Sequence, residues 1–275
     1  MNDLRSIPAY LMRGGTSKGL IFHKKDLPSD RNILTEYLLK IMGSPDVRQI
    51  NGLGGGTSVT SKVCIISKSL EKDVDIDYFF AQVEVDRNHV DYAPTCGNML
   101  SALGPFAIEE GLVETSNEIT KVNVKSINTN ALITLDVPTP DGKLKYSGDF
   151  KIDGVPGTGS QILMNFKNLE GKTTGNLFPT GNTTDTFDGI NVTCFDLATS
   201  MMICDAKEFN ILGNENSKEL NNNKKLLDKI EKIRLLAGKK MGMGDVKGKV
   251  LPKVSLLSKS INQNSIVSRY FTPYS

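Results

Sequence analysis

A cysteine followed by glycine and asparagine is the feature of this sequence that is best suited to chemistry. Cys96, Gly97 and Asn98 stand at the start of an apolar run that ends near Glu110, a pattern that predicts a helix. A thiol at a helix N-terminus lies near the positive end of the helix dipole and the free amides of the first turn, which favour the reactive thiolate. A buried structural cysteine is the alternative, because free cysteines are among the most buried residues. Glycine and asparagine pack poorly in a core, and this favours a catalytic role for Cys96.

A glycine-rich segment, 52–62 (GLGGGTSVTSK), is the second candidate. Its successive backbone amides and hydroxyl groups could hold a carboxylate or a phosphate, although a flexible turn would have the same composition. The segment lacks the GK[ST] ending of a nucleotide-binding loop, so it indicates nucleotide binding only weakly. Lys62 ends the segment; a lysine sheltered from water or close to another cation can act as a base, whereas most lysines are simply solvated. The residues that would form this binding loop are Gly54, Gly55, Gly56, Thr57 and Ser58.

A third cluster, MRGGTSKG at 12–19, combines glycines, two hydroxyl groups and two cations. Arg13 and Lys18 could neutralise the carboxylates of a substrate, while Thr16 and Ser17 hydrogen-bond to them. The alternative is a β-hairpin loop in which the cations occur by chance. Two such clusters within one small domain favour a polyanionic small molecule as the ligand.

The remaining candidates are weaker. Arg269 could reach a cleft from the second half of the chain, although a solvated strand arginine is the more ordinary interpretation. His89 precedes the cysteine segment and is better explained as a histidine at a strand end. With only one further histidine, His23, and no CxxC pair, the sequence predicts no metal site. The other three cysteines lie in apolar strand runs and are expected in the core: Cys64, Cys194 and Cys204.

A buried helix among many short strands must position these groups. The helix that follows Cys96 is apolar all round its axis, which is typical of a buried helix. An earlier helix, 30–42, has Asp30 as its N-cap and Gly43 just beyond its end. Runs rich in Val, Ile, Phe and Tyr, bounded by turn residues, predict strands at 10–12, 20–22, 63–67, 78–85, 121–125 and 131–137.

The second half is organised differently. Turn residues concentrate in 138–159, and a polar stretch precedes a new β pattern. We therefore expect an N-terminal lobe at 1–187 and a C-terminal lobe at 188–275. Within the second lobe we expect a solvated loop at 210–224 and a surface helix with a basic side at 225–243. The strands expected in this lobe lie at 189–204, 254–257 and 266–271.

Composition narrows the function classes. The 275 residues are 39% hydrophobic and 23% charged, with a net charge of +2, as in an ordinary globular chain long enough to bury its core. The balanced charge and the absence of tryptophan argue against a nucleic-acid partner. No apolar run is long enough to span a membrane, and the N-terminus has no signal-peptide pattern. We therefore expect a cytoplasmic protein with reduced thiols and no membrane partner.

Three motifs in order, MRGGTSKG, GLGGGTSVTSK and CGNMLSALGPFAIEEG, resemble those of the PrpF family, and the resemblance covers essentially the whole chain. This family contains 2-methylaconitate isomerases, associated with the 2-methylcitrate cycle of propionate catabolism, and is close to the 4-oxalomesaconate tautomerases. The resemblance implies an α+β, diaminopimelate epimerase-like fold. In that fold two pseudo-symmetric, strand-rich barrels each surround a central helix, and the active site lies in the cleft between them.

The chemistry that the resemblance implies is cofactor-independent proton transfer on an unsaturated tricarboxylate such as 2-methylaconitate. Lys62 and Cys96 would be the base and the acid, in either assignment, and backbone amides would stabilise an enediolate-like anion. A homodimer and a functional link to an aconitase-type dehydratase are further expectations. The substrate-binding residues expected from the motifs and the resemblance together are Thr16, Ser17, Lys18, Gly55, Gly56, Thr57, Ser58, Gly97, Asn98, Met99 and Arg269.

One departure leaves alternatives open. The family's second lobe has its own central helix, whereas this sequence ends at Ser275, before such a helix, so we expect a shortened second lobe. An unfinished lobe would expose apolar strand surface and unpaired edges and would weaken or abolish turnover. The alternatives are a catalytically impaired accessory or binding protein of the same fold, and a 4-oxalomesaconate tautomerase-like enzyme. An amino-acid epimerase fits least, because it needs a second thiol in the cleft and no second CG motif occurs.

Overall fold

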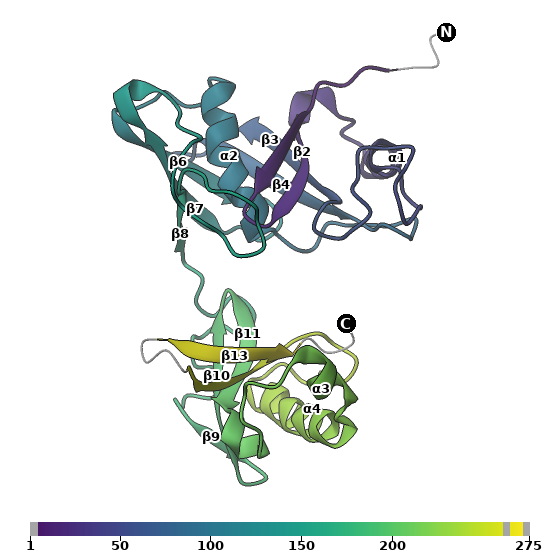
Figure 1. The fold of residues 1–275 in the computed structure, drawn as a ribbon, viewed down its shortest axis with the longest axis vertical. Helices are drawn as coiled ribbons and strands as arrows, with labels where there is room; N and C mark the ends of the chain where they lie inside the picture. The colour runs from purple at the N-terminus through teal and green to yellow at the C-terminus, as the bar shows by residue number, and fades with distance from the viewer. Residues whose placement is uncertain (1–4, 261–264, 272–275) are drawn as a thin grey trace. The chain divides into compact units, whose positions relative to one another are not determined.

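The structure, a computed structural model, describes residues 5–260 and 265–271. It divides into two compact units, Met1–Asn168 (unit 1) and Leu169–Ser275 (unit 2), shown in Figure 1. Each unit combines a sheet with helices, so the α+β class expected from the sequence is confirmed. None of the described helices combines the length and the apolar character needed to cross a bilayer.

The segment 169–187 belongs to unit 2, which corrects the expected lobe boundary at residue 187. The amides of Thr173 and Thr174 donate to the carboxylate of Asp196 at 2.7 and 2.8 Å. Asp196 is completely buried, and these hydrogen bonds offset part of the cost of removing its carboxylate from water. The polar composition of this segment suggested that it lies outside the second lobe. Its polar groups instead hydrogen-bond with that lobe.

Eight strands and two α-helices make up the described part of unit 1. They are β1 (Tyr10–Gly14), β2 (Ser17–His23), α1 (Arg31–Met42), β3 (Lys62–Lys68), β4 (Ile76–Val83), β5 (Val90–Asp91), α2 (Gly97–Glu109), β6 (Glu118–Ser126), β7 (Leu132–Thr139) and β8 (Leu163–Lys167). The sheet order is β1-β2-β3-β4-β6-β7-β8, with β5 beside β4. The pairs β2–β3 and β4–β6 are parallel, and α1 and α2 are their crossovers, since parallel neighbours need a long connection.

Helix α1 covers one face of this sheet. Asp30 Oδ1 accepts hydrogen bonds from the amides of Asn32 and Ile33 at 2.9 and 3.0 Å, so the predicted N-cap is confirmed. Gly43 ends the helix with a φ of 81°, a left-handed conformation that glycine adopts readily. The apolar side of α1 packs against β2 and β3 through a core that includes Leu34, Leu38, Met42, Leu20, Phe22, Val63 and Ile65.

Helix α2 covers the opposite face and contacts β1, β2, β6 and β7. Met99, Leu100, Leu103 and Phe106 are completely buried, so the expected buried helix enclosed by strands is confirmed. This is the arrangement expected of an epimerase-like lobe. The strand side chains in the core around α2 include Ile21, Cys64, Ile66, Tyr78, Phe80, Val122, Val124, Ile133, Leu135 and Val137.

Unit 2 repeats part of this topology. Its described elements are β9 (Asp185–Phe187), β10 (Ile190–Leu197), β11 (Thr199–Asp205), α3 (Ser217–Asn222), α4 (Lys224–Lys240), β12 (Lys253–Lys259) and β13 (Ile266–Phe271). The strands β10–β13 pair as β1–β4 do: an antiparallel pair, a helical crossover to a parallel strand, and an antiparallel fourth strand. The described residues of unit 2 contain no equivalent of α2, and the expected shortening of this lobe stays a prediction.

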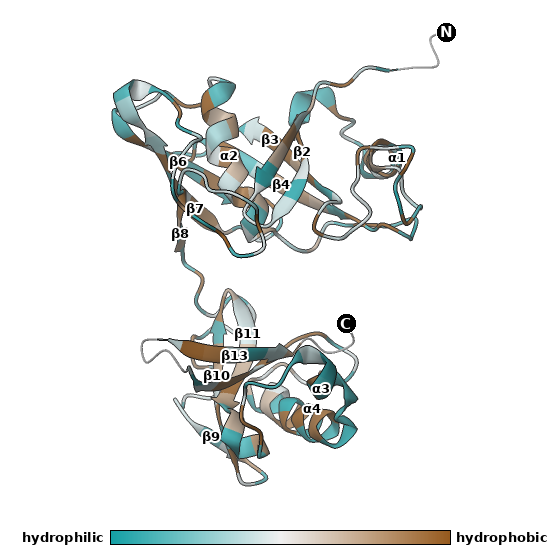
Figure 2. Ribbon diagram, in the orientation of Figure 1, coloured by the Kyte–Doolittle hydropathy of each residue, from teal (hydrophilic) through white to brown (hydrophobic). Residues whose placement is uncertain are grey.

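Helix α3 corrects the expectation for 210–224, whereas α4 confirms the helix expected at 225–243. Helix α3 lies within the stretch expected as a solvated loop, and Asn216 and Glu219 form a capping box at its start with two hydrogen bonds of 3.0 Å. Helix α4 has the expected solvated basic side, since its lysines are exposed, while its hydrophobic side packs in the core of unit 2 (Figure 2). The buried apolar residues of α4 are Leu226, Ile230, Ile233 and Ala237.

Candidate active site

The first and third sequence motifs meet at the N-terminus of α2. The β1–β2 hairpin pairs Gly14 with Ser17, so Gly15 and Thr16 form its turn. Asn98 Nδ2 donates to the Thr16 hydroxyl at 3.0 Å, across 82 residues of sequence. A Cβ at Gly14 would overlap the backbone of Asn98, so this close approach requires glycine.

The glycine-rich segment is fixed against the same hairpin. The Lys18 amide donates to the Val59 carbonyl at 2.9 Å. The parallel register of β2 and β3 then places Gly19 beside Lys62. All three motifs therefore lie together in unit 1.

Lys62 projects from β3 on the side of the sheet that faces α2. Side chains alternate along a strand, and Cys64 and Ile66, which share this face with Lys62, belong to the core around α2. The Lys62 amine donates to Gln82 Oε1 at 2.7 Å and lies 5.3 Å from the centre of the Phe80 ring. The amine is thus half-buried, oriented by an amide and next to an aromatic face, a partly sheltered setting for proton transfer.

Gln82 is a partner of Lys62 that the sequence did not reveal. Its Nε2 donates to the carbonyls of Ser58 and Ser61 at 3.1 and 2.9 Å. A side-chain amide has only two N–H donors, so these two bonds hold Oε1 toward Lys62. The register of β3 and β4 pairs Lys62 with Gln82. The available signal was a polar residue on the same side of the strand 78–85 as the aromatic residues Tyr78 and Phe80.

Four amides of the glycine loop are already bonded within the protein, which corrects the expectation that Gly54 to Thr57 form an anion-binding nest. The amides of Gly54, Gly55, Gly56 and Thr57 all donate to nearby protein oxygens. The Gly56 amide, for example, donates to Gln49 Oε1 at 3.0 Å. The loop is therefore a rigid turn that precedes Lys62, and these four donors are already used.

Cys96 is the N-cap of α2, and no hydrogen bond from a helix amide to its side chain is present. Its carbonyl accepts from the Leu100 amide at 3.1 Å and from the Tyr78 hydroxyl at 3.5 Å. Cys96 is 9% exposed, and a Cβ at Gly97 would meet nothing within 4 Å. The backbone after Cys96 is thus open to a ligand, as the sequence predicts.

The buried thiol of Cys64 has a pKa that depends on both Lys62 and Cys96. Burial raises the pKa of the Cys64 thiol far above its ordinary range, and the nearby Cys96 raises it further. A hydrogen bond with Tyr78 and the positive charge of Lys62 lower the same pKa. Cys64, Phe80 and Cys96 belong to the same core around α2. Lys62 lies against the Phe80 ring, so Lys62 and Cys96 both border this core.

Two other predicted residues have different surroundings. Ser17 is buried, and its hydroxyl has no hydrogen-bond partner among the described residues, so it can serve a ligand. The Met99 side chain, by contrast, is completely buried in the core around α2. The expected role of Met99 in substrate binding stays a prediction for its backbone amide in the first turn of α2.

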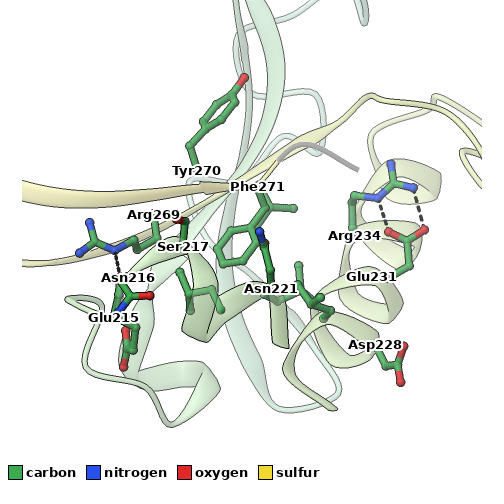
Figure 3. Close-up of a pocket in the computed structure, with 14 residues that line it drawn as sticks. Glu215, Asn216, Ser217, Asn221, Asp228, Glu231, Arg234, Arg269, Tyr270 and Phe271 are labelled. Carbon is green, nitrogen blue, oxygen red and sulfur yellow. Dashed lines mark hydrogen bonds and ion pairs between the residues drawn. The ribbon is translucent and has the colours of Figure 1, made fainter. Parts of the chain in front are cut away.

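Arg269 lies in unit 2. Its Nε donates to the Glu215 carbonyl at 2.6 Å, at the edge of a cavity of about 700 Å³ that α3, α4 and β13 line (Figure 3). Elsewhere around this cavity, the buried Arg234 pairs with both carboxylate oxygens of Glu231, at 2.7 and 2.8 Å (Figure 3). Arg269 holds the segment before α3, and its expected role in substrate binding stays a prediction.

These residues can support proton transfer beside an anion. Lys62 and Cys96 can each accept or return a proton, while Asn98 and the first-turn amides of α2 can donate to a developing negative charge. Within the described part of the chain, no three His, Cys, Asp or Glu side chains are grouped to share a metal ion.

Comparison with known proteins decides the family. A sequence model described as PrpF protein matches residues 4–269. The chain belongs to the PrpF family. The resemblance carried by the three motifs is thereby confirmed over nearly the whole chain.

Named relatives of this PrpF-family chain are isomerases or tautomerases. It is 45% identical to the "Putative isomerase YbhH" of Escherichia coli K12, over 99% of this chain and 78% of that protein. It is 44% identical to the "4-oxalomesaconate tautomerase" of Pseudomonas putida, over 98% of this chain and 74% of that protein. The crystal structure of a methylitaconate-delta-isomerase superposes with a TM-score of 0.86 at 37% identity, covering 97% of this chain and 75% of that one.

Proposed function

We propose that this PrpF-family isomerase moves a proton on an unsaturated polycarboxylate without a cofactor. Isomerase activity in general follows from the family and from relatives named isomerase or tautomerase. The observation that supports the finer proposal is a chain of contacts from Lys62 to Cys96. The Lys62 amine lies 5.3 Å from the centre of the Phe80 ring, that ring lies 6.3 Å from the Tyr78 ring, and the Tyr78 hydroxyl donates to the Cys96 carbonyl at 3.5 Å. A cytoplasmic location, a homodimer and a link to an aconitase-type dehydratase stay predictions.

The reaction begins with removal of a proton from a carbon next to a carboxylate that is conjugated with a double bond. The electron pair left behind spreads into the carboxylate and forms an enediolate-like anion. The Asn98 amide and the α2 amides donate to the oxygens on which this charge develops, and Ser17 supplies a further hydroxyl. A helix N-terminus favours the same negative charge through its dipole.

The second half of the reaction returns a proton to another carbon of the anion. Either Lys62 removes the proton and Cys96 returns one, or the two exchange these roles. No electron is gained or lost, because one C–H bond breaks, another forms and the double bond shifts between them. The half-buried amine of Lys62 and the buried thiol of Cys96 limit access of water to the anion.

The substrate class follows from the charge that surrounds the site and from the names of the relatives. The hairpin that holds Asn98 carries Arg13 and Lys18 beside its turn, which suits a molecule with several carboxylates. We propose 2-methylaconitate or a similar unsaturated tricarboxylate. Relatives are named for 2-methyl-aconitate, 3-methylitaconate and 4-oxalomesaconate, and all three are unsaturated acids with two or more carboxylates.

Direct conversion assays test this proposal. The purified chain, dialysed against a chelator, is incubated separately with 2-methylaconitate, 3-methylitaconate and 4-oxalomesaconate, and the vinyl protons are followed by NMR. We expect at least one acid to give its double-bond isomer with nothing added. Conversion that requires an added cofactor would contradict the proposal. Binding of these acids without conversion would also contradict it and would favour an accessory protein of the same fold.

A further inference from the structure

A separate cavity of unit 1 shares a wall with the candidate active site. It has a volume of about 290 Å³ and is lined by residues of β1 and β8, the two ends of the sheet order. Gly15 of the hairpin turn and Asn98 of α2 line it as well. Residues of the turn-rich segment 145–162 form the remaining wall. The cavity therefore begins at the contact that joins the first and third motifs.

The charge of this cavity is positive. Arg13 and Lys145 line it, and its lining contains no aspartate or glutamate. Neither cation forms an ion pair with a carboxylate in the described part of the chain. Arg13 Nη1 donates to the Gly15 carbonyl at 2.9 Å, which holds the guanidinium beside the turn. An arginine without a carboxylate partner is well suited to bind one, because its planar fork matches both oxygens.

The rest of the lining is mainly apolar. Ala102 and Pro105 of α2 are buried beneath the cavity, and hydroxyl groups of Ser101 and Ser160 lie among them. Pockets for small ligands typically combine such an apolar surface with a few placed polar groups. The other apolar residues of the lining are Met12, Phe150, Ile152, Val155, Ile162 and Met164.

We infer that this cavity, the Arg13 pocket, binds the carboxylate-bearing end of the substrate that lies away from the reacting carbon. Arg13 pairs with that carboxylate, and the apolar surface accepts the carbon chain or its alkyl substituent. This inference rests on the proposed function, because the substrate extends from the Cys96 end of α2 past Asn98 into the pocket. The pocket then determines which substituted polycarboxylates fit, while Lys62 and Cys96 act on the other end.

Binding of a compound that cannot isomerise tests this inference apart from catalysis. The probe is propane-1,2,3-tricarboxylate, a saturated acid, titrated calorimetrically into the full chain. Arg13→Gln should weaken binding about tenfold or more, as loss of a charge-assisted bidentate contact does. Lys145→Gln should weaken it about threefold. The matched controls Arg87→Gln and Lys143→Gln, which remove exposed cations outside the pocket, should leave binding unchanged.

Two results would overturn the inference: no binding of the probe by the wild type, or equal binding by wild type and Arg13→Gln. Kinetics separate it from the proposed function. Arg13→Gln should raise KM while kcat stays within about twofold, because the lost contact is made equally in the ground and transition states. A fall in kcat at constant KM would also count against the pocket. If Lys62→Ala keeps full turnover, the proposed function fails while the binding result for Arg13 still decides the pocket.

Discussion

The Lys62 amine donates to Gln82 Oε1 at 2.7 Å, and the carbonyls of Ser58 and Ser61 hold both N–H donors of the same amide. The loop that precedes Lys62 therefore fixes the acceptor that orients Lys62. This explains why a glycine-rich turn stands directly before the lysine even though its own amides are occupied. In the proposed mechanism the segment positions the amine that transfers the proton, while the amides of Gly54, Gly55, Gly56 and Thr57 bond to protein oxygens.

Gln82→Glu should shift the pH–rate profile. A carboxylate beside Lys62 favours the ammonium form, so the limb of kcat/KM that reports Lys62 moves to higher pH by about one unit. If Lys62 is the base, the rising limb moves and activity at pH 7 falls about tenfold; if Lys62 is the acid, the falling limb moves. Gln82→Met is the control, since it removes the hydrogen bond without adding charge. A profile for Gln82→Glu that matches that of Gln82→Met would contradict this role of Gln82.

Gly15→Ala should cost more than Gly154→Ala, although both glycines have a positive φ, of 51° and 80°. The backbone strain of alanine at either site costs about 1 kcal/mol. A Cβ at Gly15 would in addition overlap Asn98 Oδ1, whereas one at Gly154 meets nothing within 4 Å. We expect Gly15→Ala to lose about 1–2 kcal/mol more in the free energy of unfolding and most of its activity. Urea titrations measure the free energy of unfolding, and kcat measures the activity. Equal losses of stability in both variants would show that Asn98 is not held by the turn.

Of the four cysteines, Cys96 should react fastest with an alkylating reagent. Burial raises the pKa of Cys194 and of Cys204 to about 12 and raises that of Cys64 further, so these three thiols stay protonated at pH 8. Cys96 is the most exposed of the four cysteines, and the space beside the next residue, Gly97, is open to a reagent. Iodoacetamide should modify Cys96 about tenfold faster or more, as peptide mapping by mass spectrometry would show. Uniform modification of the four cysteines would contradict the reactive role of Cys96.

The C-terminal end of α2 should make stability depend on pH. Glu110 accepts hydrogen bonds from Tyr10 and His23, and these lower the pKa of the Glu110 carboxyl, with the Tyr10 bond contributing most. A carboxyl with a lowered pKa in the folded state stabilises the fold above its unfolded value of about 4.3 and loses that contribution as the pH falls through its folded value. Glu110→Gln should therefore be less stable than the wild type at pH 7, and the difference should shrink below pH 4. Urea unfolding at both pH values measures it, and a difference that does not change would contradict the assignment.

Local patterns predicted the elements that carry the site. The cap at Asp30, the stop at Gly43 and the all-round apolar character of α2 are properties of adjacent residues, so the sequence is enough to place both helices. A family resemblance led us to expect that the three motifs meet. Local sequence patterns do not predict that Thr16 and Asn98 are neighbours. The turn that brings them together depends on a hairpin register and on glycines without side chains.

Non-local hydrogen bonds account for what the sequence could not predict. Gln82 lies beside Lys62 because β4 pairs with β3. The amides of the glycine loop donate hydrogen bonds to acceptors such as Gln49. The segment 169–187 belongs to unit 2 and not to unit 1, and two of its amides donate hydrogen bonds to Asp196 of unit 2. Each of these depends on which strand lies next to which, information that composition and periodicity do not contain.

Solvent exchange into a substrate tests the central claim most directly. The full chain is incubated in D2O with trans-aconitate, and loss of the proton signal is followed by NMR for the wild type, Lys62→Ala, Cys96→Ala and the control Cys194→Ala. The account predicts that wild type and control incorporate deuterium at the same rate, and that each of the other two variants slows incorporation by about 100-fold or more. Exchange at the wild-type rate in both Lys62→Ala and Cys96→Ala would contradict it.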